Sequence, residues 1–307
     1  MKYIIIGGVA AGMSAAMEIK RTDDSAEITV LERDEDYSHG QSGLPYVING
    51  LVPSTKDVIA RTVETFREKY SIDARIYTNV TKVDPQNHQV IGFHLDSNQS
   101  FTLKYDRLLI ATGADPILPA WPGINLEGIH TLKTLQDTNG LMTDLTEEIK
   151  HVTIVGAGYI GLEMAESFRS IGKEVTLIQR GGQLAKIFDE DMSKLIEKEA
   201  LYHQVDIKLA EEVTGFSGKE RVEAVITNKS TYSTDLVLLS AGVKPNTDLL
   251  KSSGIQMNRE GAIRVNAYME SSIPNVYAAG DCATHYHMIK QLDDYIPLGT
   301  TANKQGR

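Results

Sequence analysis

The sequence predicts an α/β fold with two parallel sheets, each covered by helices and each carrying a small antiparallel insertion. Two observations predict it. A short apolar strand runs into a glycine-rich turn and a helix twice, at Gly7–Gly12 and at Gly156–Gly161. Each helix is followed by another apolar strand, which gives two strand–helix–strand units. We therefore expect two domains, with residues 1–118 and 246–307 forming the first and residues 119–245 the second.

Length and composition limit the class of protein. The chain has 307 residues, with 41% hydrophobic and 23% charged residues, which is a normal globular composition. The net charge of −10 and a pI near 5.3 argue against a nucleic-acid partner. The only cysteine, Cys282, excludes an intrachain disulfide and a cysteine metal cluster, and we expect no metal site. Without a signal peptide or an apolar run long enough for a membrane span, we expect a cytoplasmic location.

The first unit begins with the apolar strand Lys2–Ile6, turns at Gly7 and continues as a helix to about Arg21. The next strand ends in the carboxylate of Glu32. A tight turn, a helix N-terminus facing a pyrophosphate and an acid for ribose hydroxyls define the dinucleotide site of a Rossmann-like domain. Val9 replaces the middle glycine of the usual G-x-G-x-x-G pattern, so the prediction depends on the surrounding elements.

The rest of the first domain is less regular. We expect a helix over Asp57–Lys69 and then an antiparallel insertion containing the strands Arg75–Thr78 and His88–Phe93. The parallel sheet resumes at Leu108–Ala111. It runs into Thr112-Gly113, where the backbone can approach a ligand closely. Three prolines then indicate a rigid crossover to the second domain: Pro116, Pro119 and Pro122.

The second unit retains all three glycines of the pattern. The strand Val152–Val155 leads into Gly156, Gly158 and Gly161, and a helix to about Ile171 follows. A further strand from Glu174 to Ile178 completes the unit. Because strand, turn, helix and strand occur in the required order, this match is specific, and the chain is predicted to bind two dinucleotides.

The two units end differently, which predicts different ligands. Glu32 would repel a 2′-phosphate and suits FAD, whose adenosine ribose carries none. The second unit ends in Gln179-Arg180, where the repulsion is absent and a guanidinium can pair with a phosphate. We therefore expect FAD in the first unit and NADP(H), or else NAD(H), in the second. Arg180 could instead be an ordinary solvated charge.

Two more strands end in glycine turns near the C-terminus. Leu236–Leu239 leads to Gly242, and the strand from Asn275 leads to Gly280-Asp281, where Asp281 can bond a polyol such as the ribityl chain of a flavin. After Pro297-Leu298 we expect a helix capped by Thr300 or Thr301. Since the sequence stops about one turn later, a further C-terminal segment is expected.

These motifs in combination resemble the pyridine nucleotide-disulfide oxidoreductases. The stretch from Ser38 to Ile48 resembles the coenzyme A-disulfide reductase branch, which is related to NADH oxidases and peroxidases. The resemblance covers the whole chain. It implies an FAD- and NAD(P)H-dependent enzyme of the cytoplasm that reduces a small-molecule disulfide such as CoA disulfide. It also implies a homodimer formed through a C-terminal domain for which this sequence is too short.

The resemblance also assigns residues. The redox cysteine of the branch falls on Ser42, and Tyr159 would be the gate over the flavin. The CoA side would be lined by Arg21, Ser38, His39, Gln41 and Asn303. The cofactor-binding positions are Gly7, Val9, Ala10, Gly12, Glu32, Arg33, Ala111, Thr112, Gly113, Gly280, Asp281, Pro297 and Leu298 for the flavin, and Gly156, Gly158, Tyr159, Ile160, Gly161, Gln179, Arg180 and Gly242 for the nicotinamide nucleotide.

Three positions keep alternatives open. Glu163 could contact the nicotinamide or be a surface carboxylate, and Tyr159 could be a packing aromatic. An alcohol at Ser42 forms no thiolate at neutral pH and no persistent disulfide, so thiol chemistry is disabled in the sequence as written. Ser42 could be an engineered replacement for cysteine. Alternatively, the protein is a thiol-independent NAD(P)H oxidase or diaphorase, or a non-enzymatic flavin-binding redox sensor.

Overall fold

The computed structural model describes residues 1–307, and the chain forms two compact units. Unit 1 contains Met1–Gly40, Ile59–Asp115 and Lys244–Arg307; unit 2 contains Gln41–Val58 and Pro116–Val243. The stretch Gln41–Val58, which lies inside the first domain in the sequence-based division, therefore packs with unit 2. None of the helices combines the length and the apolar character needed to cross a lipid bilayer.

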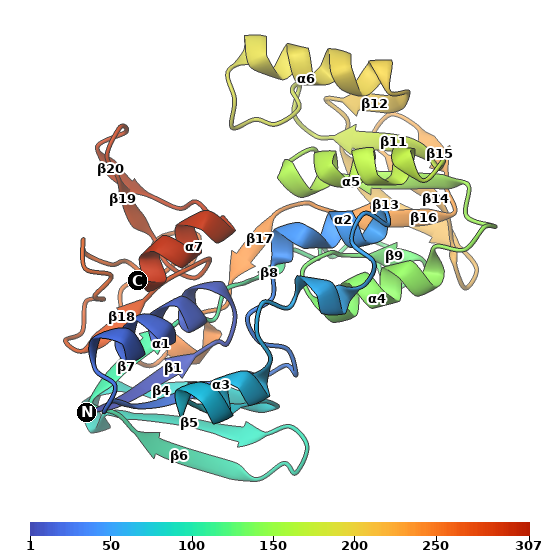
Figure 1. The fold of residues 1–307 in the computed structure, drawn as a ribbon. Coiled ribbons are helices and arrows are strands. Elements are labelled where there is room, and N and C mark those ends of the chain that lie inside the picture. Colours follow the sequence, from blue (N-terminus) through green and yellow to red (C-terminus); the bar gives the residue numbers. More distant parts are fainter. The chain divides into compact units, whose positions relative to one another are not determined.

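Unit 1 is built on a five-stranded parallel sheet (Figure 1). The strands, in spatial order, are β18 (Val276–Ala278), β7 (Arg107–Ile110), β1 (Lys2–Ile6), β2 (Glu27–Leu31) and β3 (Asp73–Arg75). Its helices are α1 (Ala10–Thr22), α3 (Val63–Tyr70) and α7 (Gly299–Gly306). The short hairpin of β19 (His285–His287) and β20 (Leu292–Asp294) precedes α7.

The central strand β1 is buried on both faces because its isoleucines alternate between two cores. Ile5 packs with Phe66 of α3 and with residues of α1 on one face. Ile4 and Ile6 point to the opposite face and pack with Val83 and other apolar residues of the antiparallel insertion. Side chains of a strand alternate between the faces of a sheet, so a run of apolar residues is needed where both faces are covered.

The antiparallel insertion of unit 1 differs from the prediction at its start. It consists of β4 (Thr78–Asp84), β5 (Gln89–His94) and β6 (Ser100–Lys104). Arg75, predicted to lie in this insertion, instead ends β3 at the edge of the parallel sheet. The helix predicted over Asp57–Lys69 begins only after Thr62, whose hydroxyl caps it by accepting a hydrogen bond from the Thr65 N–H. A capping side chain breaks the helical pattern that the composition alone suggests.

Unit 2 repeats the parallel design with its own five-stranded sheet (Figure 1). The order is β12 (Val205–Leu209), β11 (Glu174–Gln179), β10 (His151–Val155), β16 (Leu236–Leu239) and β9 (Ile129–His130). The helices are α2 (Leu44–Ile48), α4 (Leu135–Asp144), α5 (Tyr159–Ser170) and α6 (Glu190–Tyr202). The antiparallel insertion is β13 (Val213–Gly218), β14 (Val222–Thr227) and β15 (Thr231–Ser233). Two short strands, β8 (Ala114–Pro116) and β17 (Val243–Pro245), lie at chain crossings between the units. The predicted fold class is therefore confirmed.

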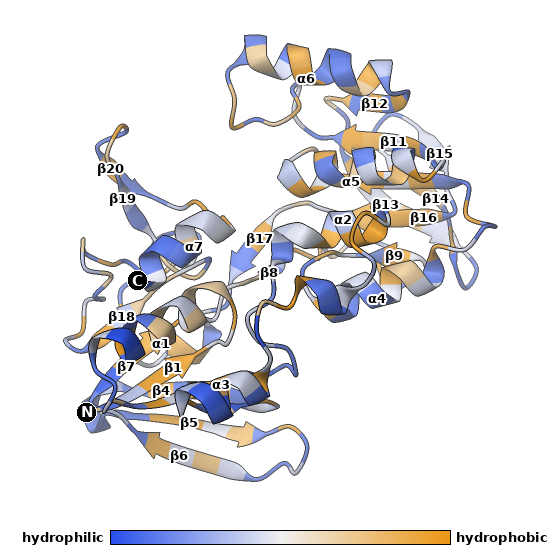
Figure 2. Cartoon of the chain, in the orientation of Figure 1, coloured by the Kyte–Doolittle hydropathy of each residue, from blue (hydrophilic) through white to orange (hydrophobic).

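Hydrophobic side chains are concentrated on the central strands of each sheet, whereas the outer helix α6 alternates between hydrophobic and hydrophilic residues (Figure 2). In unit 2, Ile154, Leu177 and Leu238 on three adjacent strands are fully buried, as is Phe168 on α5. Because α5 is packed on the sheet, the position of its first residue, Tyr159, directly after the glycine-rich turn, is fixed.

The segment Gln41–Val58 is fastened to unit 2 by side chains of α4 and α5. Ser167 of α5 donates a hydrogen bond to the carbonyl oxygen of Pro45 at 3.1 Å, and both groups are buried. Thr55 donates to the side-chain oxygen of Asn139 at 3.0 Å. Leu44 and Val47 are buried as well. These contacts place α2 firmly in unit 2.

The last helix of unit 1 begins earlier than predicted. Its N-cap is Leu298, which offers no side-chain hydrogen bond, so the expected cap at Thr300 or Thr301 is wrong. The helix packs on α1, where Ser14 donates to the side-chain oxygen of Asn303 at 2.8 Å. Small residues at the contact, Ala11 and Ala302 among them, allow the two helices to approach closely.

Phe168 tests this packing in unit 2. Phe168→Ala should lower the free energy of unfolding of unit 2 by about 3–5 kcal/mol, because a fully buried ring leaves a cavity. The matched control is Tyr202→Ala, whose side chain is 78% exposed. Urea unfolding followed by the fluorescence of Trp121, the only tryptophan, reports on unit 2. Equal effects of the two substitutions would contradict the packing described here.

Candidate functional site

In unit 1, four strand ends bring the predicted flavin-binding residues to one edge of the sheet. Gly7 directly follows β1, Glu32 directly follows β2 and Ala111 directly follows β7, while Gly280 follows β18 by two residues. These four strands are adjacent and parallel, so their carboxyl ends lie together. This edge is where open α/β sheets bind ligands.

The first glycine-rich turn is held by close backbone contacts. Gly7 has a φ of +109° and donates its N–H to the carbonyl oxygen of Leu31 at 2.9 Å. A β-carbon on Gly7 would overlap the carbonyl oxygen of Ala111, and one on Gly12 would overlap that of Gly7. Both glycines are therefore required by the backbone. Val9, the departure from the usual pattern, is the N-cap of α1 with an ordinary negative φ.

A second glycine of this turn was not singled out from the sequence. A β-carbon on Gly8 would meet the ring of Tyr37, which is 1% exposed and whose single O–H lies within hydrogen-bond distance of the carbonyl oxygens of Val30 and Arg75. The turn thus needs glycine one position earlier than the general pattern states. Only the buried aromatic side chain, distant in the sequence, accounts for this.

The turn leaves the start of α1 available to an anion. The helix has no acidic residue in its first turn and no side-chain cap on its first N–H groups. Unsatisfied N–H groups and the helix dipole favour a phosphate at this place. Ala10 is the first residue of the helix and presents only a small side chain. The residues present therefore fit a dinucleotide pyrophosphate.

Glu32 is 7% exposed and is oriented by two backbone groups. Gly8 donates its N–H to one carboxylate oxygen at 2.6 Å, and Asp34 donates to the other at 3.1 Å. Burial raises the pKa of the Glu32 carboxyl group, and the two hydrogen bonds oppose this rise. Because each carboxylate oxygen accepts more than one hydrogen bond, Glu32 keeps capacity for ribose hydroxyls.

The residue after Glu32 belongs to a polar network at the same sheet edge. Arg33 pairs with Asp115 at 2.9 Å, and the side chain of Asn246 donates to the same carboxylate oxygen at 2.9 Å. Thr112 donates to the carbonyl oxygen of Asn246 at 2.7 Å. The Asn246 N–H donates to the carbonyl oxygen of Gly113 at 3.0 Å. This network fixes the position of Thr112 and Gly113, which were expected to approach the flavin.

The third part of the flavin edge lies before α7. Gly280 has a φ of +84°, and its N–H donates to the side-chain oxygen of Gln305 at 2.7 Å. Tyr295 donates to the carbonyl oxygen of Asp281 at 2.8 Å. Pro297 and Leu298 directly precede α7, with Leu298 as its N-cap, and the first turn of this helix contains no acidic residue. The turn after β18 is thus tied to the last turn of α7 and to the segment that precedes this helix.

The only thiol of the chain is structural. Cys282 is fully buried, and its sulfur contacts the carbonyl oxygens of Ile110 and Ala279 at 3.4 Å. Burial raises the pKa of the Cys282 thiol. A thiol of this kind is inert, because the thiolate is the reactive form.

Unit 2 carries a second turn of the same geometry after β10. Gly156 has a φ of +106°, and a β-carbon there would overlap the carbonyl oxygen of Ser240 at the end of β16. Gly161 lies against Gly156 in the same way. Gly158, the N-cap of α5, faces open space, so its lack of a side chain is not required by the protein itself. Space above this glycine is what a pyrophosphate needs.

The strand end beside this turn holds Gln179 and Arg180. The side-chain oxygen of Gln179 accepts a hydrogen bond from the Ala157 N–H at 3.2 Å, which ties it to the turn. Arg180 has an 82% exposed side chain and lies 3.8 Å from a carboxylate oxygen of Glu212. Gly242, near the end of β16, has a φ of +111°. The predicted coenzyme residues of unit 2 therefore meet at the carboxyl edge of its sheet.

Two predicted residues lie on the first turns of α5 after Gly158. Tyr159 is 42% exposed and contacts the ring of Phe188 edge to face, with 6.5 Å between the ring centroids. Glu163 lies on the same helix, four residues after Tyr159 and therefore about one turn further along. Partial burial raises the pKa of Glu163, and the charge of Glu166 adds to the rise. Phe188 gave no signal in the sequence.

The stretch around Ser42 is divided between the units. Ser38, His39 and Gly40 belong to unit 1, and the chain from Gln41 belongs to unit 2. Ser38 adopts a left-handed conformation with φ of +47°, and its N–H donates to the carbonyl oxygen of Gly8. Gln41 donates to the carbonyl oxygen of Lys133 at 3.2 Å. Ser42 is exposed in a short 3₁₀ turn before α2, and no base hydrogen-bonds its hydroxyl.

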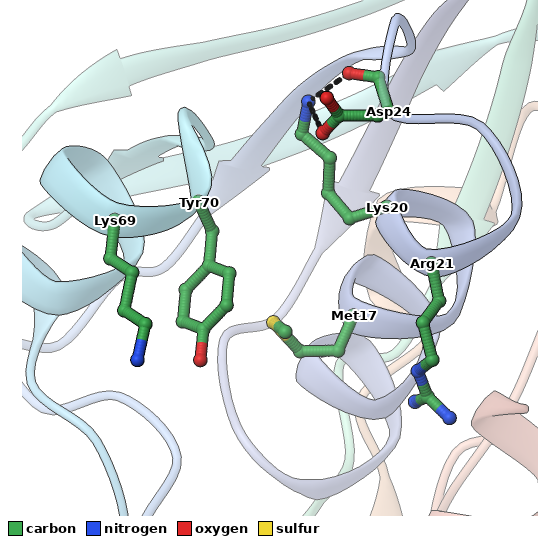
Figure 3. A pocket seen from close by; sticks show the side chains of 6 residues that line it. All are labelled: Met17, Lys20, Arg21, Asp24, Lys69 and Tyr70. Carbon is green, nitrogen blue, oxygen red and sulfur yellow. Dashed lines mark hydrogen bonds and ion pairs between the residues drawn. The ribbon is translucent and has the colours of Figure 1, made fainter.

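A pocket on the surface of unit 1 lies between α1 and α3 (Figure 3). Its walls are Met17, Lys20, Arg21, Asp24, Lys69 and Tyr70. Lys20 points towards Asp24 and donates to the backbone oxygen of that residue at 2.6 Å, whereas Lys69 and Arg21 extend separately. Arg21 was expected on the substrate side. The contribution of Lys69 was missed because it comes from a helix far away in the sequence.

Comparison with known proteins gives the family. The family described as pyridine nucleotide-disulphide oxidoreductase matches residues 1–306. The chain is 39% identical over 305 residues to the NAD(P)H sulfur oxidoreductase (CoA-dependent) of Pyrococcus abyssi, covering 99% of this chain and 67% of that protein. It is 35% identical over 309 residues to the NADH oxidase of Methanocaldococcus jannaschii, covering 100% and 68%.

A solved structure agrees with this assignment. The reduced CoADR-RHD of Bacillus anthracis superimposes with a TM-score of 0.96 at 31% identity, over 100% of this chain. The chain spans 55% of the length of that protein. The two glycine-rich turns, their polar strand ends and these similarities lead to one conclusion: the chain belongs to the pyridine nucleotide-disulphide oxidoreductase family.

Proposed function

We propose that this protein is an FAD-dependent NAD(P)H oxidoreductase of the CoA-disulfide reductase type. The observation that carries the proposal is the presence, in each unit, of a helix N-terminus open to a phosphate behind a glycine held at positive φ. Bound FAD supplies a two-electron carrier between a nicotinamide and a final acceptor. In this proposal unit 1 holds FAD and unit 2 holds the nicotinamide nucleotide.

The proposed roles follow from the contacts of each residue. Glu32 binds ribose hydroxyls, while α1 and α7 direct N–H groups towards the phosphate and ring ends of the flavin nucleotide. Tyr159 is the mobile cover of the coenzyme site, since its exposed ring has a single aromatic neighbour. Glu163 contacts the nicotinamide end. The acceptor is a small disulfide such as CoA disulfide, and the active form is a homodimer.

Ser42 occupies the position proposed for the redox thiol. A disulfide is reduced either by an attacking thiolate, which opens the S–S bond, or by direct electron transfer from the flavin. An exposed alcohol supplies no thiolate at neutral pH. The chain as written therefore transfers electrons to flavin without thiol exchange. A NADH oxidase among its relatives supports the alternative, direct use of oxygen or another thiol-independent acceptor.

Replacing Ser42 distinguishes these functions. In the FAD-loaded protein, NADPH should bleach the flavin without air in the parent and in Ser42→Cys alike. The rate at which CoA disulfide reoxidises the flavin should be about a hundredfold or more higher in Ser42→Cys than in the parent, because thiol attack is the step that the parent lacks. Stopped-flow absorbance measures both steps.

Other outcomes separate the alternatives. Rapid reoxidation of the parent by oxygen would favour the oxidase. If neither NADPH nor NADH bleaches the flavin, the enzyme proposal fails and a binding or sensing role remains.

Two glycines of unit 2 provide a matched test of the coenzyme site. Gly156→Ala should lower the free energy of unfolding by about 1–3 kcal/mol, because its backbone is at positive φ and lies against Ser240. Gly158→Ala should leave stability unchanged and raise the Kd for NADPH about tenfold, since its β-carbon meets only the space proposed for the pyrophosphate. Thermal unfolding and coenzyme titration measure the two effects. Unchanged NADPH affinity in Gly158→Ala would place the coenzyme elsewhere.

The pocket between α1 and α3 is the proposed site for the phosphates of CoA. Lys69 projects from α3 next to Tyr70, with its ammonium nitrogen 5.6 Å from the centre of the Tyr70 ring, and Arg21 projects from α1 on the other side of Met17 (Figure 3). Cationic side chains on two walls of one pocket suit the several phosphates at the nucleotide end of the substrate. Ser38, His39, Gln41 and Asn303 are the other residues proposed to contact CoA.

Lys69→Gln tests this pocket. In the Ser42→Cys background it should raise the KM for CoA disulfide about three- to tenfold, as expected for the loss of one partly exposed phosphate contact. The KM for NADPH should not change. Lys82→Gln, an exposed lysine of β4, is the control for the change in net charge. The same increase in both variants would contradict a specific role of the pocket.

A further inference from the structure

The end of strand β12 places a carboxylate beside the proposed coenzyme arginine. Strands β11 and β12 are parallel neighbours in which Gln179 is aligned with Leu209. Arg180 follows the first strand, and Glu212 follows the second by three residues. One guanidinium nitrogen of Arg180 lies 3.8 Å from a carboxylate oxygen of Glu212, and the side chains are 82% and 53% exposed. The pair therefore forms at the rim of the site and not in the core.

The backbone holds both partners in place. The N–H of Glu212 donates to the side-chain oxygen of Asn228 at 3.0 Å, and the Asn228 N–H donates to the carbonyl oxygen of Glu212 at 2.9 Å. On the other side, the Glu211 N–H donates to the carbonyl oxygen of Gln179, and the Ala210 N–H donates to that of Gly181. The loop after β12 is thereby fixed next to Arg180.

The preceding acid shows that the two carboxylates have different roles. Glu211 is 5% exposed and accepts a hydrogen bond from Thr227 at 2.6 Å, so it faces the interior of unit 2. Glu212 faces outward to Arg180. Only Glu212 is therefore placed to act on a charged ligand at this sheet edge.

We propose that Glu212 is a specificity-determining residue that competes with the 2′-phosphate of NADPH for Arg180. This inference rests on the proposed coenzyme site of unit 2. A phosphate that pairs with Arg180 must either displace Glu212 or bind close to its negative charge. A ribose without the phosphate meets no such repulsion. Glu212 thus weakens the preference for NADPH over NADH that Gln179 and Arg180 would otherwise give.

Both groups are solvated, so the effect is modest and depends on salt. Removing the carboxylate should tighten binding of a 2′-phosphate about three- to tenfold at low ionic strength. The gain should shrink at high salt because exposed charges are screened beyond roughly 3 Å at 1 M. The salt dependence separates an electrostatic effect from a change of shape.

The test compares two nucleotides on the FAD-loaded protein, in which FAD fills the site of unit 1. Calorimetry gives the Kd for adenosine 2′,5′-bisphosphate and for ADP. Glu212→Gln should tighten the bisphosphate about three- to tenfold and leave ADP unchanged. The control Glu148→Gln removes one exposed carboxylate from the loop before β10, at the opposite end of the parallel strands, and should change neither value.

A second background tests the competition itself. In Arg180→Gln, the further change Glu212→Gln should give a smaller gain for the bisphosphate, because the contested cation is absent and only the direct repulsion by Glu212 is removed. An unchanged ratio of the two Kd values in the single variant, or an equal gain without Arg180, would overturn the inference while ADP binding leaves the proposed site intact. Failure of both nucleotides to bind the parent would overturn the coenzyme site and the inference together.

Discussion

Both units depend on one close approach between a glycine and the neighbouring strand. Gly7 lies against the carbonyl oxygen of Ala111, and Gly156 lies against that of Ser240, with no room for a side chain in either place. The approach lets the chain leave a strand and begin a helix at once, so that the first N–H groups of the helix remain open. The proposed phosphate and ribose sites and the position of the polar strand ends all depend on this turn.

The sequence was sufficient wherever a local pattern and a backbone requirement agreed. The strand Lys2–Ile6 is found with the predicted bounds, because an apolar run covered on both faces can form little else at that length. In the second turn, the glycine pattern correctly indicated a tight backbone turn, in which Gly156 and Gly161 leave no room for a β-carbon.

Other features depend on contacts that no local pattern contains. The helix predicted from Asp57 starts later because Thr62 caps it, and the last helix starts at Leu298 without any capping side chain. The need for Gly8 comes from the buried ring of Tyr37. The neighbours Phe188 of Tyr159 and Glu212 of Arg180 become visible only once loops and strands are placed side by side.

Ser42 is the one proposed site residue whose side chain does not suit the proposed reaction, because an alcohol cannot carry out thiol exchange. The residues that surround the proposed flavin and coenzyme sites have the hydrogen bonds and positive-φ glycines of nucleotide-binding turns, whereas the position proposed for the redox thiol carries an alcohol. The close backbone contacts that shape the two turns are those of Gly7 with Ala111 and of Gly156 with Ser240, and neither involves Ser42. Electron delivery and thiol exchange are therefore proposed to depend on separate groups of residues.

The central claim is that unit 1 binds a flavin, and an absorbance spectrum tests it directly. After incubation with FAD and removal of free cofactor, the protein should be yellow, with a band near roughly 450 nm from the oxidised flavin and one flavin for each chain. A colourless protein that retains no FAD would contradict the account, because every later step of the proposed function passes through that site.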